Sequence, residues 1–243
     1  MQTRVLIVVC IILSFTAGLV VASFASFRVF LPGLLEGARL TVLITVLGCA
    51  VAVVMAFVAG ITRMYGPLPL RWLAVGYIEV FRGTSALVQL FWLFFVLPHF
   101  GVTLEPITVA VLALGLNVGA YGAEVVRGAI NAVPRGQWEA TIALNMSRLV
   151  ALRRIILPQA VLAMIPPWGN LFIELLKATA LVSLITISDL AFKAAQMNQT
   201  TYRTVEIFSI VLVFYLAIAA LITIAMRALE RLAARGLARG RSA

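Results

Sequence analysis

Residues 40–62 read LTVLITVLGCAVAVVMAFVAGIT, an apolar run without a charged side chain. A helix that crosses a bilayer needs about 20 predominantly apolar residues, so this stretch predicts a membrane span. The whole chain has the same character, since 63% of its 243 residues are hydrophobic and 12% are charged. Soluble domains are about 45–50% apolar and about 25% charged. The sequence therefore predicts an all-α integral membrane protein.

Further apolar segments lie on both sides of this run, and together they predict about six transmembrane helices. The others are Val5–Phe27, Trp72–Leu97, Pro106–Ala123 with an extension toward Val126, Ile155–Ser188 and Ile207–Met226. Val5–Phe27 has two interpretations, a cleaved signal peptide and a retained helix. A retained helix is favoured because the apolar region exceeds the usual 7–15 residues of a signal peptide. Ile155–Ser188 is too long for one plain span, and its prolines predict a break.

The basic side chains predict the orientation of the chain. With the N-terminus in the cytoplasm, thirteen Lys and Arg residues fall in cytoplasmic segments and four in outer segments. This bias follows the positive-inside rule, so both termini are predicted to be cytoplasmic. The outer segments are then 28–39, 98–105 and 189–206. The net charge of +10 is spread between and after apolar runs, as in cytoplasmic membrane loops, and is not clustered on a polar domain that would suit nucleic acid. The tail arginines, four apart from Arg227 to Arg239, are expected to anchor the helix end at anionic lipid.

The longest predicted cytoplasmic connection, residues 126–154, has neither the composition of a flexible linker nor that of a stiff one. Within it, QWEATIALNM at 137–146 predicts a short amphipathic helix. This helix is expected to end at Asn145, because Asn tolerates the left-handed backbone that closes helices. A second helical stretch, Arg148–Ile156, is expected to stop near Pro158. The resulting cytoplasmic helix–turn–helix is equally compatible with a passive helix at the lipid surface.

Polar side chains inside the apolar segments are candidates for a substrate pathway, because exposing them to lipid is costly. Asn117 and Tyr121 are four residues apart and share a helix face. That face lies beside a seam of small residues suited to close helix packing, made of Gly115, Gly119 and Gly122. Lys177, Thr179 and Ser183 form a second candidate set. A structural alternative stays open for each set, an interhelical hydrogen bond for the first and hydroxyls bonded to their own helix for the second.

Two pairs of opposite charge lie within or beside the predicted spans. Glu79 and Arg82 are three residues apart, as are Glu174 and Lys177. Residues at this spacing are neighbours on a helix surface, so each pair is predicted to neutralise itself. Lys177 has a second interpretation, in which its charge meets a substrate carboxylate.

The loop after the fourth span resembles the EAA loop of ATP-binding-cassette importer permeases. The signature is Glu-Ala-Ala, three residues, Gly, nine residues, and then Ile, any residue and Leu-Pro. Here Glu139-Ala140-Thr141 is followed at the same spacing by Asn145 and by residues 155–158, IILP. Thr141 and Asn145 depart from the signature conservatively. The resemblance implies a coupling helix that docks into a groove of an ATPase subunit, carried by Glu139, Ala140, Thr141, Leu144, Asn145, Met146, Leu157 and Pro158.

Three further segments are similar to the polar amino acid uptake group of these permeases. They are YIEVFRGT at 77–84, GAEVVRG at 122–128 and ELLKATALVS at 174–183. The likeness covers roughly residues 34–232. It implies a permease transmembrane domain at 31–232 with the coupling loop at 127–158. Residues 1–30 are then an extra N-terminal transmembrane helix, and residues 233–243 form a basic cytoplasmic tail.

The same resemblance implies a permease subunit of a bacterial inner-membrane importer for a polar amino acid or a compatible solute such as ectoine. Many relatives carry Asp where this chain has Ala178, which argues against a cationic cargo. Glutamine, glutamate and opine-type solutes stay open. The implied partners are ATPase subunits, a second permease subunit of the same or a sister chain, and a periplasmic or lipid-anchored solute-binding protein.

The sequence contains no phosphate-binding loop of the form G-x-x-x-x-G-K-[ST]. ATP hydrolysis is therefore expected on a partner, and the chain is not expected to be an enzyme or to hold a cofactor or metal. Two alternatives remain: an ion-coupled secondary transporter, which often shows internal repeats, and a membrane scaffold without transport activity.

Overall fold

The computed structural model describes residues 25–239, and the side chains of residues 29–234. Every regular element in this range is a helix, which confirms the predicted all-α class. Four helical segments are long and apolar enough to cross a membrane, and a bent pair of helices adds a fifth. The first predicted span, Val5–Phe27, lies outside the described residues apart from its last three positions.

Helix α2 runs without interruption over Ala25–Tyr65 and contains Pro32. The predicted outer segment 28–39 is thus helical and continuous with the next span, and its position on the outer side stays a prediction. Phe30, Leu34 and Ala38 from this stretch are buried against α9 and α10. This packing extends the helix beyond the membrane span, as tertiary burial commonly does for amphipathic segments.

The third predicted span is not one straight helix. Helix α3 covers Leu68–Gly83, and the chain then bends by 108° into a second helical stretch that reaches Phe100. This second stretch consists of α4 (Ala86–Phe91), a π-helical segment (Trp92–Val96) and a 3-10 segment (Leu97–Phe100). The bend lies at Thr84 and Ser85, both in extended conformation, where small hydroxyl residues follow Gly83.

Helix α5, Pro106–Asn131, is the central helix and packs most extensively on α2. The predicted glycine seam is confirmed. A Cβ atom added at Gly115 would lie 2.8 Å from the Cβ of Val51, and one added at Gly122 would lie 2.8 Å from that of Ala56. Glycine is therefore required on this face for the two backbones to approach so closely.

The chain from Arg148 to Ile185 is helical throughout. It comprises α7 (Arg148–Ala151), a π-helical segment (Leu152–Ile156), α8 (Leu157–Ala178) and a 3-10 segment (Thr179–Ile185). The expected stop near Pro158 is wrong, because Pro158 lies in the first turn of α8, where its missing N–H matters least. Pro166 and Pro167 also lie within α8. Helix α8 ends only at Ala178, after which the 3-10 segment begins.

Helix α9, Leu190–Thr201, occupies most of the segment 189–206 that was predicted as an outer connection. Helix α10, Thr204–Arg239, is longer than the predicted span Ile207–Met226. The predicted tail 233–243 continues this helix as far as Arg239.

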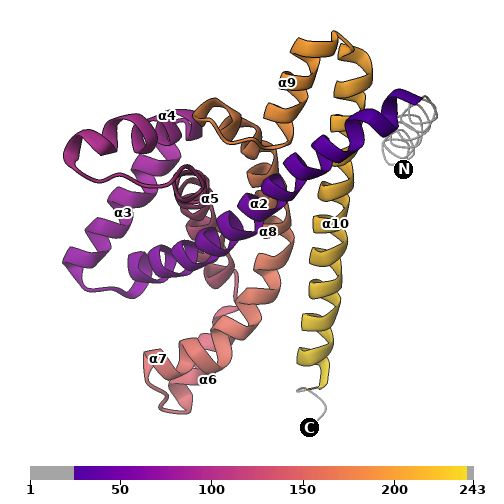
Figure 1. Cartoon of the computed structure of the whole chain (residues 1–243). Helices are drawn as coiled ribbons and strands as arrows, with labels where there is room; N and C mark the ends of the chain where they lie inside the picture. The colour runs from indigo at the N-terminus through magenta and orange to yellow at the C-terminus, as the bar shows by residue number, and fades with distance from the viewer. Residues whose placement is uncertain (1–24, 240–243) are drawn as a thin grey trace.

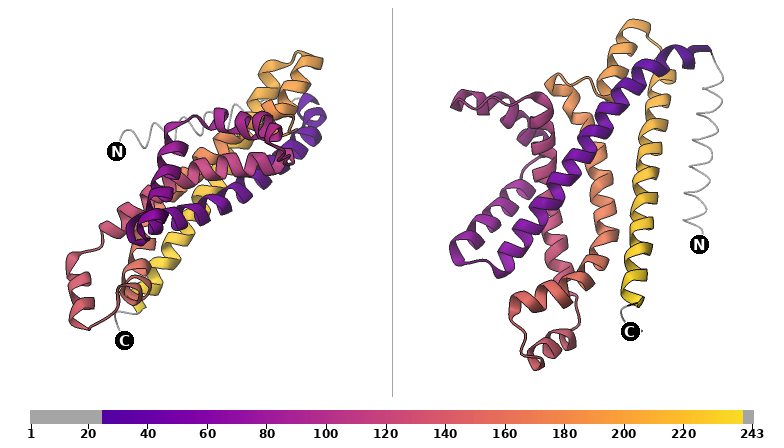
Figure 2. Two further views of the ribbon diagram at one scale, coloured as in Figure 1. Left: turned by 90° about the vertical axis from the view of Figure 1, so that its left-hand side faces the viewer. Right: turned by 60° about the horizontal axis from the view of Figure 1, so that its bottom comes forward.

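The helices define two opposite ends of the molecule (Figures 1 and 2). The α6 end holds α6 (Arg135–Ala143), α7, the connection between α2 and α3, and the last turns of α10. The α9 end holds α9 and the bend at α4. Helix α2 crosses the bundle obliquely between the two ends (Figure 1). The connections predicted to be cytoplasmic thus lie together at the α6 end.

Candidate functional site

The segment that resembles a coupling loop forms a compact turn at the α6 end. Helix α6 ends at Ala143, and Asn145 takes the left-handed conformation with φ of 52°, as predicted. Thr141 is 2% exposed, and its hydroxyl donates to the Trp138 carbonyl over 2.7 Å. The Met146 amide donates to the Thr141 carbonyl over 3.0 Å and closes the turn. Thr141 therefore anchors the turn from inside and does not present a surface for a partner.

The outer surface of this turn is apolar and exposed. Ile142 and Leu149 are each 75% exposed, and Leu144 is 70% exposed. Glu139, Ala140 and Asn145 are exposed beside them. We call this surface the α6 knob: residues 139, 140, 142, 144, 145 and 149. An exposed cluster of large apolar side chains rimmed by polar groups is typical of a protein-binding surface.

Leu157 and Pro158 lie apart from the α6 knob, at the base of α8. Leu157 packs with Trp138 against the core between α2, α5 and α8. The Gln159 side chain donates to Gln137 over 3.1 Å, which ties α6 to α8. These contacts give Leu157 a supporting position behind the turn. Met146, which is half-buried, completes the eight predicted residues.

Glu124 is the centre of an ionic cluster that connects three helices. It pairs with Arg63 of α2, with Arg127 of α5 over 2.7 Å, and with Arg82 of α3 over 3.8 Å. The prediction that Glu79 neutralises Arg82 is wrong, since Glu79 is exposed and makes no salt bridge among the described residues. The sequence carried a signal for this cluster, a lone carboxylate at the end of the apolar segment 106–126, because such groups need partners inside a membrane.

Asn117 and Tyr121 both reach the broken end of α3. The Asn117 amide donates to the Phe81 carbonyl over 2.9 Å, and the Tyr121 hydroxyl to the Arg82 carbonyl over 3.3 Å. Gln89 also donates to the Phe81 carbonyl, over 2.9 Å. A helix end within a membrane needs such partners for its free carbonyls. The interhelical alternative is therefore the arrangement observed for this pair.

The second candidate set for the substrate pathway lies at the α9 end of α8 and consists of Lys177, Thr179 and Ser183. Thr179 is fully buried and its hydroxyl donates to the Leu176 carbonyl over 2.7 Å, while Ser183 donates to the Ala180 carbonyl over 2.8 Å. Both hydroxyls are thus bonded to their own helix. Lys177 and Glu174 are exposed and form no salt bridge, so the predicted pair between them is absent from the described part of the chain. No hydrogen bond or ion pair in that part joins this set to Asn117 or Tyr121.

Asp189 is a buried carboxylate that the sequence analysis placed in an outer connection. One of its oxygens accepts from the Phe192 amide over 2.9 Å and caps the start of α9. The other oxygen is buried and has no partner among the described residues. Burial raises the pKa of Asp189 to about 6, against the lowering effect of the backbone amides. The signal available in the sequence was Asp at the position before a helical stretch, a common helix cap.

Comparison with known proteins gives a consistent set of relatives. Residues 48–235 match the family described as "Binding-protein-dependent transport system inner membrane component". A probable amino-acid ABC transporter permease protein of Sinorhizobium fredii is 44% identical over 83% of this chain and 87% of the relative. The glutamine transport system permease protein of Escherichia coli is 38% identical over 83% of this chain and 93% of the relative.

A solved structure supports the same relationship. The chain of an amino acid ABC transporter crystallised with histidines superposes with a TM-score of 0.79 and 35% sequence identity. The superposition covers 86% of this chain and 98% of that chain. The similarity therefore extends over nearly the whole part of the chain that the structure describes.

Proposed function

This chain belongs to the family of binding-protein-dependent transport system inner membrane components, and we propose that it moves a polar amino acid or an amino-acid-like compatible solute across the bacterial inner membrane. It is the permease component of an amino-acid ABC importer, and the ATPase is a separate subunit. This membership sets aside the secondary transporter and the scaffold as alternatives.

The α6 knob carries the proposal of how ATP hydrolysis is coupled to transport. Its exposed side chains Ile142 and Leu144 project from the α6 end, where the positive-inside bias puts the cytoplasm. Burial of the neighbouring Thr141 and the left-handed turn at Asn145 hold them in place. Two large apolar side chains on a rigid turn suit insertion into a groove of the ATPase subunit. The knob thus transmits movement of the ATPase to α8 through Leu157 and Gln159.

The proposed assembly contains two permease subunits, the ATPase subunits, a periplasmic or lipid-anchored solute-binding protein and membrane lipid. The second permease is a copy of this chain or a sister chain. The solute-binding protein meets the α9 end, where most of 98–105 and the last turn of α9, residues 199–201, are exposed. With Val5–Phe27 retained as a span, both termini are cytoplasmic.

The cargo contacts are proposed at the exposed members of the two polar sets. Tyr121 is 39% exposed, and its ring centroid lies 5.4 Å from the Arg82 guanidinium carbon, an arrangement that holds a cation where a carboxylate could meet it. Asn117 lies one turn away on the same helix, and Lys177 is exposed on α8. Thr179 and Ser183 reach a solute only if the 3-10 segment rearranges, because Thr179 is fully buried.

The coupling proposal is tested by changing Glu139 to Lys in the complex reconstituted with its ATPase and solute-binding protein. Reversing the charge on the knob is expected to weaken ATPase assembly and to lower solute-stimulated ATP hydrolysis at least tenfold, about 1.4 kcal/mol. Glu230→Lys is the matched control, since it makes the same change on an exposed residue of α10 at the same end. Unchanged assembly and hydrolysis in Glu139→Lys would contradict the coupling role.

The cargo is tested by competition. Uptake of labelled ectoine into proteoliposomes is measured against an excess of unlabelled glutamine, glutamate, an opine and arginine. We propose ectoine as the first candidate because the runs ALNM at 143–146 and KATALVSLIT at 177–186 resemble those of permeases for ectoine-type compatible solutes. Ala178, where many relatives carry Asp, argues only against a cationic cargo. Absence of ectoine uptake, or its strong inhibition by glutamine or arginine, would replace this assignment while leaving the coupling proposal intact.

A further inference from the structure

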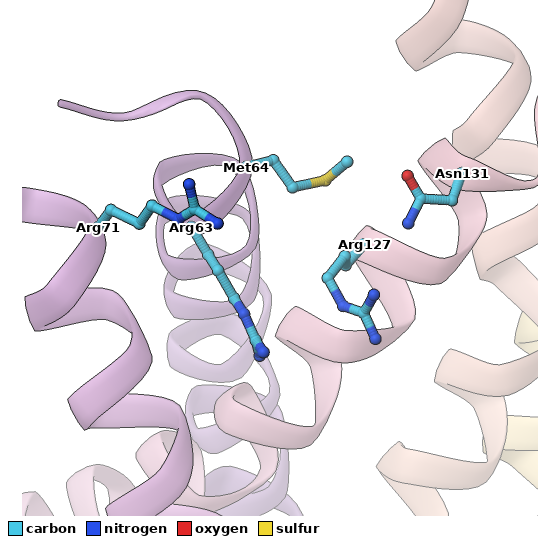
Figure 3. Close-up of a pocket in the computed structure, with 5 residues that line it drawn as sticks. All are labelled: Arg63, Met64, Arg71, Arg127 and Asn131. Carbon is cyan, nitrogen blue, oxygen red and sulfur yellow. The ribbon is translucent and has the colours of Figure 1, made fainter. Parts of the chain in front are cut away.

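A basic cleft lies between the end of α2, the first turn of α3 and the last turns of α5. It has a volume of about 320 Å³ and is lined by Arg63, Met64, Arg71, Arg127 and Asn131. Figure 3 shows the α2 and α3 residues on one side of the cleft and the two α5 residues on the other. Because a water molecule takes about 30 Å³, the cleft has room for a hydrated phosphate group.

Positive charge in the cleft exceeds negative charge. The carboxylate of Glu124 faces both Arg63 and Arg127. Arg71 adds a third guanidinium, which makes no hydrogen bond or ion pair with any described residue, and the amide of Asn131 is equally unpartnered within that range. A guanidinium carries five N–H donors and pairs with phosphate in a bidentate manner. The cleft therefore offers unused donors and a net positive charge to an anion.

The position of the cleft along the spans indicates where that anion comes from. The candidate spans of α2 and α5 end beside the cleft, at Tyr65 and Asn131, so the cleft belongs to the end of the bundle that would face lipid headgroups and not to its middle. Beside it, Leu68 and Trp72 are each 68% exposed and lie one helical turn apart. Arg71 shares their face of α3 by its spacing from Leu68. An exposed Trp next to basic residues is typical of the membrane interface.

We propose that this cleft binds the phosphate group of an anionic phospholipid, with Arg71, Arg127 and Asn131 as donors and the acyl chains along Leu68 and Trp72. The two exposed apolar side chains beside the cleft, Leu68 and Trp72, favour a lipid over a free phosphate ion, because only a lipid has acyl chains to pack on them. The inference rests on the proposed function only for the depth of the cleft in the membrane. Cargo and ATP coupling do not enter it.

The test uses Trp72 as a built-in reporter. The delipidated complex of the full chain with its ATPase is titrated in detergent with dibrominated phosphatidylglycerol or dibrominated phosphatidylcholine. Quenching of Trp72 is obtained as the difference from a Trp72→Phe variant. We expect phosphatidylglycerol to quench at a lower concentration than phosphatidylcholine. Arg71→Gln should raise the phosphatidylglycerol concentration at half-quenching about fivefold, the effect of one basic residue near an anionic surface.

Two further variants make the result specific. Arg135→Gln removes an exposed arginine at the same end but outside the cleft and should leave the titration unchanged. Asn131→Asp places a carboxylate in the cleft and should abolish the preference for phosphatidylglycerol. The proposal is overturned if both lipids quench equally, if neither quenches, or if Arg71→Gln matches the unsubstituted chain. Complete displacement of phosphatidylglycerol by inorganic phosphate would assign the cleft to free phosphate instead, whereas we expect only weak competition.

Discussion

Asp189 illustrates how the burial of one side chain creates a dependence on pH. Its carboxylate is fully buried, with one oxygen on the first turn of α9 and the other without a partner in the described part of the chain. Burial raises its pKa from 3.8 to about 6, so the folded chain binds this proton more tightly than the unfolded chain does. The stability that this bound proton gives to the folded chain is fully present below about pH 4 and is lost as the pH rises through 6.

We predict that Asp189→Asn removes this dependence. Asn keeps the helix cap but has no charge to bury, so the variant should be the more stable form at pH 8 by roughly 3 kcal/mol. The measurement is the midpoint of thermal unfolding in detergent between pH 5 and pH 8, compared with the unsubstituted chain. Glu36→Gln, at an exposed carboxylate of the α9 end, should retain the original pH slope. An identical slope in Asp189→Asn would contradict the prediction.

Glu124 is the second residue whose contacts make a measurable prediction. Its side chain is 20% exposed and holds arginines from α2, α3 and α5. Glu124→Gln leaves three partly buried cations without their shared anion and should lower the free energy of unfolding by about 1–3 kcal/mol. Glu174→Gln removes an exposed carboxylate without a salt bridge and should change it little. Equal unfolding midpoints for the two variants would show that the cluster contributes nothing.

Helix packing is decided at the scale of elements by the face that α5 presents to α2. We predict that Gly122→Val destabilises the chain by about 1–3 kcal/mol, because the new side chain meets a neighbour that has no room to move. That neighbour is the Cβ of Ala56, at 2.8 Å from a Cβ added at this glycine. Gly128→Val is the matched control on the same helix, since nothing lies within 4 Å of its added Cβ. Comparable unfolding midpoints for both variants would rule out a role for the seam.

The elements themselves differ from their prediction at points where distant contacts act. Residues 28–39 look like a connection because they carry Arg28, Pro32, Glu36 and Arg39, yet they are helical where α9 and α10 bury one face of them. Gly83 to Ser85 lie inside a segment predicted as a single span, and the chain bends there by 108°. The carbonyls freed by that bend are satisfied by Asn117 and Tyr121 from α5. No local pattern contains that information.

At the scale of the whole molecule, the structure separates two surfaces with different chemistry. The α6 end carries the α6 knob and the basic cleft, and the last turns of α10 lie at the same end (Figure 1). The α9 end carries the buried Asp189 and the exposed segment 98–105. The ionic cluster at Glu124 connects α2, α3 and α5 near the α6 end. A movement of the knob therefore has a direct structural route through α8 and α5 to the bend in α3.

Local physical chemistry was enough to predict the membrane class, the approximate spans, the glycine seam and the left-handed turn at Asn145. Each depends on the residue itself or on neighbours within a turn or two of helix. The partners of Arg82 and Asn117, the burial of Asp189 and the unused donors of Arg71 required the tertiary structure. These properties arise from side chains that are far apart in the sequence and are brought together only when α2, α3 and α5 pack. The apolar run at 40–62 thus predicted that this protein folds in a lipid bilayer. The packing of its helices decided which of its polar groups stay available to a ligand.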